Sequence, residues 1–197
     1  MILKKLLFLV MSINCTQLYA QETILAQAGD VKIIQKNCND ETYECDYVQT
    51  FQDTSKILLS DWNKTAVAYQ FSPHLIGFKM GATNIPHLLT TYDSHNNSQK
   101  FFDVMMIDEE KKCFITQEEV KQNQYEIKFY RLPSLQAYFT MNTQTQGLED
   151  FQSIATHYQD EEDHSFNFNY ALIEDDESYY KDIKVLQPCS DQPIIQY

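Results

Sequence analysis

The alternation of apolar and polar side chains constrains the fold of this chain more than any other feature of its sequence. In residues 165–172, which read SFNFNYAL, every second residue is aromatic or aliphatic and the residues between are small or polar. Successive side chains of a β-strand point to opposite faces of the sheet, so this pattern predicts a strand with one buried face. Shorter runs rich in β-branched and aromatic residues recur from residue 31 onward and predict up to about ten strands in all.

Three pairs of these runs lie close enough in the sequence to form hairpins. We expect 31–37 to pair with 43–51, 100–108 with 112–116, and 165–172 with 179–187.

One segment has helical spacing instead. In residues 147–159, which read GLEDFQSIATHYQ, apolar side chains recur every three or four positions, and two acidic residues occupy the expected first turn, where they favour the helix dipole. No linker divides the chain and no internal sequence repeat is found. The sequence therefore predicts a single mainly β (α+β) domain over residues 21–197. We expect an antiparallel β-sandwich or barrel-like sheet with one amphipathic helix near 147–159.

The first twenty residues have the composition of a secretory signal peptide. Lys4 and Lys5 precede an apolar stretch over residues 6–13, and Ala20 supplies a small residue for cleavage. A second small-residue motif, AQA at 26–28, lies far from that stretch. The stretch is too short to anchor the chain in a bilayer. We therefore expect residues 1–20 to be removed, the mature chain to be secreted or periplasmic, and no membrane span to remain.

Four cysteines are left after this cleavage: Cys38, Cys45, Cys113 and Cys189. An even number in an exported protein indicates disulfide bonds, for which four cysteines allow three connectivities. A short turn would bring Cys38 and Cys45 within bonding range, and Cys113 would then pair with Cys189. A zinc site is disfavoured, because six residues separate the first two cysteines and the nearest histidine is His74.

The chain is strongly acidic. It has 28 Asp and Glu residues against 15 Lys and Arg residues, which gives a formal net charge of −13, and Arg131 is its single arginine. Such a surface repels nucleic acid and anionic membranes and attracts basic molecules. Arginine is the usual residue for binding phosphate groups. We therefore expect a basic protein partner rather than a nucleic acid or a nucleotide, and no cofactor.

Acidic residues gather in three short segments that are candidate partner-binding surfaces, although such segments are also typical of solvated loops. DEED at 160–163 and EDDE at 174–177 flank an expected strand of about ten residues, so they should lie roughly 30 Å apart at opposite rims. The third segment lies between the first two cysteines of the mature chain. The candidate residues are Asp40, Glu41, Glu44, Asp160, Glu161, Glu162, Asp163, Glu174, Asp175, Asp176 and Glu177.

Motifs for catalysis and metal binding are weak. The sequence has no G-x-S-x-G nucleophile elbow and no glycine-rich phosphate loop, and its four glycines leave few positions for either. His157 and His164 flank four acidic residues but lack the spacing of a zincin site. We therefore expect no catalytic residue and no metal ligand.

These observations favour binding over catalysis. We expect an exported acidic protein that neutralises a basic partner protein, as an inhibitor or an immunity-type protein does. Two other classes stay open. One is a carboxylate-dependent hydrolase of the cell envelope, in which two of the many acidic residues would act together. The other is a structural envelope component that only packs against its neighbours.

Overall fold

A computed structural model describes residues 22–197 apart from 84, 122–123, 146–147, 149–153, 161 and 175–176. The described residues form sixteen β-strands in four antiparallel sheets of four strands each. Within each sheet the strands follow chain order, so every sheet is a meander whose neighbouring strands are joined by turns. In this part of the chain there is no helix long and apolar enough to cross a membrane. The prediction of a mainly β fold is confirmed.

The first two sheets cover the N-terminal half. The first contains β1 (Thr23–Ala28), β2 (Val31–Asn39), β3 (Glu44–Phe51) and β4 (Thr54–Trp62). The second contains β5 (Ala66–Ser72), β6 (Leu75–Ala82), β7 (Ile85–Asp93) and β8 (Ser98–Phe101).

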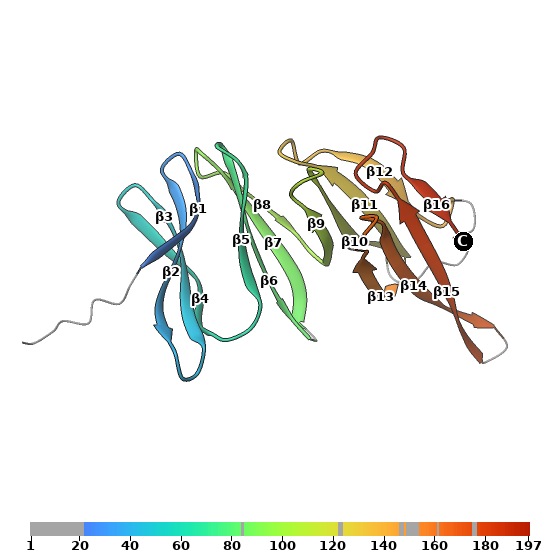
Figure 1. The fold of residues 1–197 in the computed structure, drawn as a ribbon, viewed down its shortest axis with the longest axis horizontal. Helices are drawn as coiled ribbons and strands as arrows, with labels where there is room; N and C mark the ends of the chain where they lie inside the picture. Colours follow the sequence, from blue (N-terminus) through green and yellow to red (C-terminus); the bar gives the residue numbers. More distant parts are fainter. Residues whose placement is uncertain are drawn as a thin grey trace, which may run out of the picture.

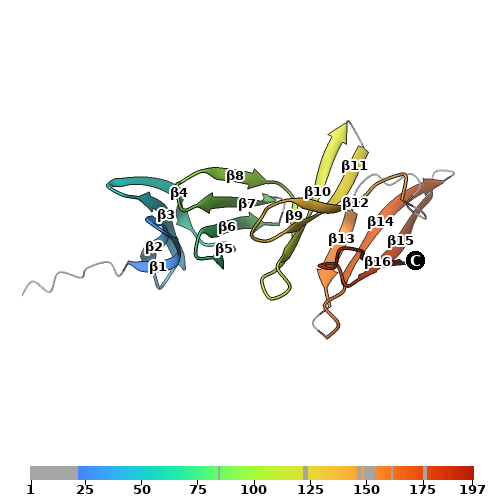
Figure 2. The same cartoon turned by 90° about the horizontal axis from the view of Figure 1, so that it is seen from above.

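The other two sheets cover the C-terminal half. The third contains β9 (Val104–Asp108), β10 (Cys113–Lys121), β11 (Gln124–Arg131) and β12 (Ala137–Met141). The fourth contains β13 (Ile154–Gln159), β14 (Phe166–Glu174), β15 (Glu177–Leu186) and β16 (Ile194–Gln196). The four sheets lie in a row in chain order (Figure 1), and Figure 2 shows the same row from above.

Three hydrophobic cores hold this row together, each between two neighbouring sheets. Ile33 and Tyr47 of the first sheet pack with Phe78 of the second. The middle core joins the second sheet to the third and includes Phe71, Leu89, Phe101, Phe114 and Tyr130. The third and fourth sheets share the largest cluster, which includes Ile115, Phe129, Met141, Phe166, Phe168 and Ile183. The expected sandwich thus describes the face-to-face packing of sheets but not their number.

The two middle sheets are covered on both faces, and short stretches of β6 and β10 are apolar without interruption for this reason. In β6, Leu75 packs in the middle core while Ile76 and Phe78 face the first sheet. In β10, Phe114 faces the second sheet while Ile115 faces the fourth. The end sheets have one covered face, so strict alternation is kept in β14.

The helix expected near 147–159 is not seen. Residues 154–159 form β13, which pairs with β14 from Ile154↔Tyr170 to Gln159↔Phe166, and residues 147 and 149–153 lie outside the described part. Most side chains of β13 are exposed, so its sequence carries no alternation that would mark it as a strand. Backbone pairing along the edge of the fourth sheet therefore outweighs the helical spacing of its apolar residues. The expected signal peptide also lies outside the described residues.

Both expected disulfides are present. Cys38–Cys45 crosses the hairpin of β2 and β3, and Cys113–Cys189 joins β10 to the loop after β15. The second bond links the third sheet to the fourth. All three expected hairpins are also found, as β2 with β3, β9 with β10, and β14 with β15. The expected strand 100–108 is shorter in the structure, because residues 100–101 end β8 of the second sheet.

Candidate functional site

The turn between β9 and β10 and the segment between β13 and β14 lie side by side where the third and fourth sheets meet, and both project to the same side of the row (Figure 2). They bring together acidic side chains that are about 50 residues apart in the sequence. We call this surface the acidic edge. Its members are Asp108, Glu109, Glu110, Asp160, Glu162, Asp163 and His164.

Asp108, the last residue of β9, is the centre of the acidic edge. Its carboxylate is buried, with 6% exposure of the residue. Oδ1 accepts a hydrogen bond from the backbone N–H of Lys111 at 2.7 Å, and Oδ2 accepts one from Nε2 of Gln159 at 3.1 Å. Nδ1 of His164 lies 3.6 Å from the same Oδ2. The carboxylate therefore closes its own turn and ties it to β13, which satisfies a buried charge.

The segment after β13 is shaped by its own aspartates. Oδ1 of Asp160 accepts hydrogen bonds from the backbone N–H groups of Glu162 and Asp163, at 2.9 Å and 3.2 Å. The backbone N–H of Asp160 in turn donates to the carbonyl oxygen of Ser165 at 2.9 Å. Aspartate commonly stabilises tight turns in this way. These acidic residues are therefore held in a defined conformation at the surface.

Asp163 adds an ion pair to this segment. Oδ2 of Asp163 accepts a hydrogen bond from Nζ of Lys184 in β15 at 2.7 Å, and Oδ1 accepts one from the backbone N–H of Ser165 at 2.9 Å. The hydrogen bond from Lys184, together with those from Ser165, holds the pKa of Asp163 well below its usual range. Asp163 therefore stays ionised throughout the physiological pH range.

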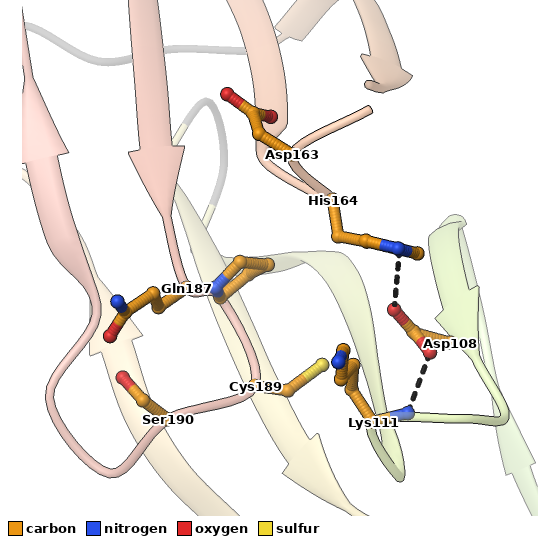
Figure 3. A pocket seen from close by; sticks show the side chains of 8 residues that line it. Asp108, Lys111, Asp163, His164, Gln187, Cys189 and Ser190 are labelled. Carbon is orange, nitrogen blue, oxygen red and sulfur yellow. Dashed lines mark hydrogen bonds and ion pairs between the residues drawn. The ribbon is translucent and has the colours of Figure 1, made fainter. Parts of the chain in front are cut away.

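Two shallow hollows adjoin the pair formed by Asp108 and His164. One, of about 380 Å³, is also lined by Lys111, Asp163 and the loop from Gln187 to Ser190. Figure 3 shows Asp108 between His164 and Lys111 at one side of this hollow. The other, of about 480 Å³, is lined by Glu109, Glu110 and Asp160 in addition to the shared pair. The acidic edge thus offers two neighbouring concave surfaces with carboxylates at their rims.

Ser190 and His164, which both line the first hollow, do not form a pair of nucleophile and base. Ser190 lines the first hollow, and its buried hydroxyl has no hydrogen-bond partner among the described residues. Figure 3 shows Ser190 beside Gln187 and His164 beside Asp108, at different sides of the hollow, so the histidine is not placed to activate the serine as a base. Among the described residues, no group of three or more His, Cys, Asp or Glu side chains is placed to hold a metal ion.

The structure brings only some of the predicted partner-binding residues together. Asp160, Glu162 and Asp163 belong to the acidic edge, whereas Glu161 lies outside the described part. Glu174 ends β14 and Glu177 begins β15. The strand register places the two residues opposite each other at the far end of the nine-residue strand β14. Asp175 and Asp176 lie outside the described part, and the expected separation of the two acidic runs fits the length of β14.

The third predicted segment lies far from the acidic edge. Asp40, Glu41 and Glu44 are at the tip of the β2–β3 hairpin, in the first sheet of the row. Oδ1 of Asn39 accepts hydrogen bonds from the backbone N–H groups of Glu41 and Thr42, at 2.8 Å and 3.2 Å, which orders this tip. The three acidic segments are therefore separate surfaces.

Sequence reasoning did not assign Asp108, Glu109, Glu110 or His164 to a partner-binding surface. Asp108 ends the expected strand 100–108, and Glu109 and Glu110 lie in the expected turn after it, so these positions were available from the sequence. Their approach to Asp160 was not, because it depends on the packing of β9 beside β13. The sequence also does not indicate that Asp108 is buried, because nothing in it distinguishes this residue from the adjacent acids Glu109 and Glu110, which are exposed.

Comparison with known proteins gives no further assignment: no family model, no curated protein and no solved structure matches this chain.

Proposed function

We propose that this chain is an exported binding protein that captures and neutralises a basic partner protein through the acidic edge. The observation that carries the proposal is the convergence of two turns, one after β9 and one after β13, on two adjoining hollows rimmed by carboxylates. An inhibitor or immunity-type role follows from this surface, because a partner whose functional groups are basic would be covered by it. The expected signal peptide supports export, and the two disulfides are compatible with an oxidising compartment.

The electrostatics of the acidic edge suit rapid and selective association. Glu109, Glu110 and Glu162 are exposed, and exposed charges around an interface mainly raise the association rate and fix orientation. Asp108 and Asp160 are engaged in hydrogen bonds to the backbone and to Gln159. They hold the turns in place, so little conformational entropy is lost when a partner binds.

A carboxylate-dependent hydrolase is supported less well. Such an enzyme needs an acidic side chain that is free to give or take a proton at the substrate. Both oxygens of Asp108, the buried carboxylate of the acidic edge, already accept hydrogen bonds within the protein. Asp108 therefore has a structural role, which is to order the acidic edge.

The experiment measures capture of basic proteins from the envelope or medium of the source organism, followed by association kinetics with the captured protein. In the edge variant, Glu109, Glu110 and Glu162 are replaced by Gln. We expect it to associate roughly tenfold more slowly at low salt and to lose most of the salt dependence. A control variant removes two charges at the distant hairpin tip through Asp40→Asn and Glu41→Gln and should keep the wild-type rate. Equal rates for all three proteins, or no captured basic protein, would contradict the proposal.

A further inference from the structure

The outer face of the fourth sheet carries another hollow, of about 460 Å³, whose lining differs from that of the acidic edge. The inner face of this sheet packs onto the third sheet through Phe166, Phe168 and Ile183. The side chains that line the hollow belong mostly to the opposite face of this sheet, which is the last sheet of the row (Figure 1). Its volume falls within the range of about 300–1,000 Å³ that is typical of small-ligand sites.

Strand register places two rows of side chains across this hollow. The register pairs Tyr158 with Asn167, Asn167 with Lys184, and Lys184 with Gln196. Two residues further along each strand, it pairs Thr156 with Asn169 and Asn169 with Asp182. Residues two apart on a strand share a face, so both rows point away from the core. The surface therefore consists of amide, hydroxyl and carboxylate groups and one ammonium group beside an aromatic ring.

The amide groups of these rows are held in fixed positions. Oδ1 of Asn169 accepts hydrogen bonds from both the backbone N–H and the hydroxyl of Thr156, each at 3.0 Å. Nδ2 of Asn167 donates to Oγ of Ser165 at 2.9 Å. An amide has both a donor and an acceptor group, and within the described residues Nδ2 of Asn169 and Oδ1 of Asn167 make no further hydrogen bond. Binding to such fixed groups costs little conformational entropy.

Tyrosines frame the hollow. Tyr158, at the end of one row, is 61% exposed, and Tyr197 is 57% exposed, with Nζ of Lys181 over its ring at 5.3 Å from the centroid. An exposed aromatic ring offers an apolar face of large area beside the polar groups. A ligand with C–H groups on one face and hydroxyl groups around its rim would use both kinds of surface at once.

The residues that line the hollow include fewer acidic side chains than the acidic edge does. Among the described lining residues, Asp182 carries the one carboxylate side chain, and the ammonium group of Lys184 is paired with Asp163. The chain as a whole has a formal net charge of −13. The lining therefore matches an uncharged ligand better than the basic partner expected at the acidic edge.

This composition is not a general property of an end sheet. The outer face of the first sheet has an aliphatic row instead, in which the register aligns Ile24, Ile34, Val48 and Ile57. We propose that the outer face of the fourth sheet binds a neutral oligosaccharide, with a sugar ring stacked on Tyr158 and its hydroxyl groups bonded to Asn167, Asn169 and Asp182. This site is separate from the surface that we propose for the basic partner.

The test begins with the purified chain on an array of neutral and anionic glycans. The neutral glycan that binds most strongly is then titrated by calorimetry against the wild type and the variants Tyr158→Ala and Asp182→Ala. We expect each variant to bind about tenfold more weakly, because each loses a ring contact or a charged hydrogen-bond acceptor. Tyr43→Ala is the matched control, since Tyr43 is a tyrosine with 80% exposure in the turn between β2 and β3, and the affinity of this variant should be unchanged.

Three results would overturn the proposal: no neutral glycan binds, only anionic glycans bind, or both variants keep the wild-type affinity. Should a variant fail to fold, the wild type alone still decides the matter by NMR. The bound glycan must shift the side-chain amide signals of Asn167 and Asn169, and unshifted signals would exclude this face.

Discussion

The guanidinium group of Arg131 lies over the ring of Tyr138, with its central carbon 4.3 Å from the ring centroid. The same group donates hydrogen bonds to the carbonyl oxygen of Cys189 and to the side chain of Asp191, and the Tyr138 hydroxyl donates to the carbonyl oxygen of Pro188. The single arginine of the chain thus holds the loop after β15 against the third sheet. Its role in this structure is to join two sheets, beside the disulfide of the same loop.

Replacement of Arg131 by Lys should lower the free energy of unfolding by about 1–2 kcal/mol. An ammonium group cannot stack on Tyr138 and donate to two acceptors in one plane, as a guanidinium group does. The measurement is the midpoint of urea unfolding at unchanged m-value. Lys100→Arg, at an exposed position, is the control and should have no effect. If Arg131→Lys also left the midpoint unchanged, the contacts of Arg131 would not contribute to holding the loop.

The two disulfides should differ in their contribution to stability. In the loop-entropy description, the Cys113–Cys189 bond closes a loop with a sequence separation of 76 and contributes about 4.5 kcal/mol. The Cys38–Cys45 bond, with a separation of 7, contributes about 2.5 kcal/mol. We expect thermal unfolding of the variant with Ala at 113 and 189 to occur at a lower temperature than that of the variant with Ala at 38 and 45. The reverse order would show that loop length does not control their contributions.

Gly77 in β6 should not tolerate a side chain. A Cβ atom at this position would lie 2.5 Å from Cε2 of Phe71 and 3.0 Å from Cδ1 of Leu89, both in the middle core. Gly77→Ala should therefore cost about 1–3 kcal/mol of unfolding free energy through overpacking. Combination with Phe71→Leu removes the nearest ring atoms, so the double variant should lose less than the sum of the single losses. Additive losses would show that the ring is not the obstacle.

Glu118 should make stability depend on pH in the acidic range. Burial alone would raise its pKa, but hydrogen bonds from Lys128 at 2.8 Å and from the Tyr130 hydroxyl outweigh burial and hold the pKa below the ordinary value of 4.5. The unfolded chain then takes up the proton first, so the stabilisation is present above pH 4.5 and is lost as the pH falls through the folded pKa.

The Glu118→Gln variant tests this dependence by urea unfolding between pH 7 and pH 3. Its deficit relative to the wild type should be largest at pH 7 and should shrink below pH 4.5. Glu109→Gln removes a similar charge at an exposed turn and should show no comparable change. If the stability deficit of Glu118→Gln stayed constant over the whole pH range, these contacts would not lower the pKa of the carboxylate.

Much of the local structure was predictable because it depends on neighbouring residues. Alternation in residues 165–172 predicted β14 and its buried face, and the spacing of Cys38 and Cys45 predicted a closed hairpin tip. The apolar runs of β6 and β10 marked them as strands. Those runs are short and are followed by polar residues, so they did not distinguish a strand covered on both faces from a strand of a two-layer sandwich, and the number of layers was not predicted. The segment that forms β13 was wrongly predicted as helix because an exposed edge strand needs no alternation.

The candidate site follows the same division. The residues of the run at 160–163 were proposed from charge alone, and the turn after β9 was expected as a turn. By itself, the sequence determined the β-rich class, the cysteines available for pairing and the strongly acidic charge, since these depend on composition and on contacts between near neighbours. Only the tertiary structure decided which acidic segments meet. The packing of β9 beside β13 brings Asp108 and Asp160 together and leaves Asp40 at the other end of the row, because contacts between distant segments are set by how whole sheets stack.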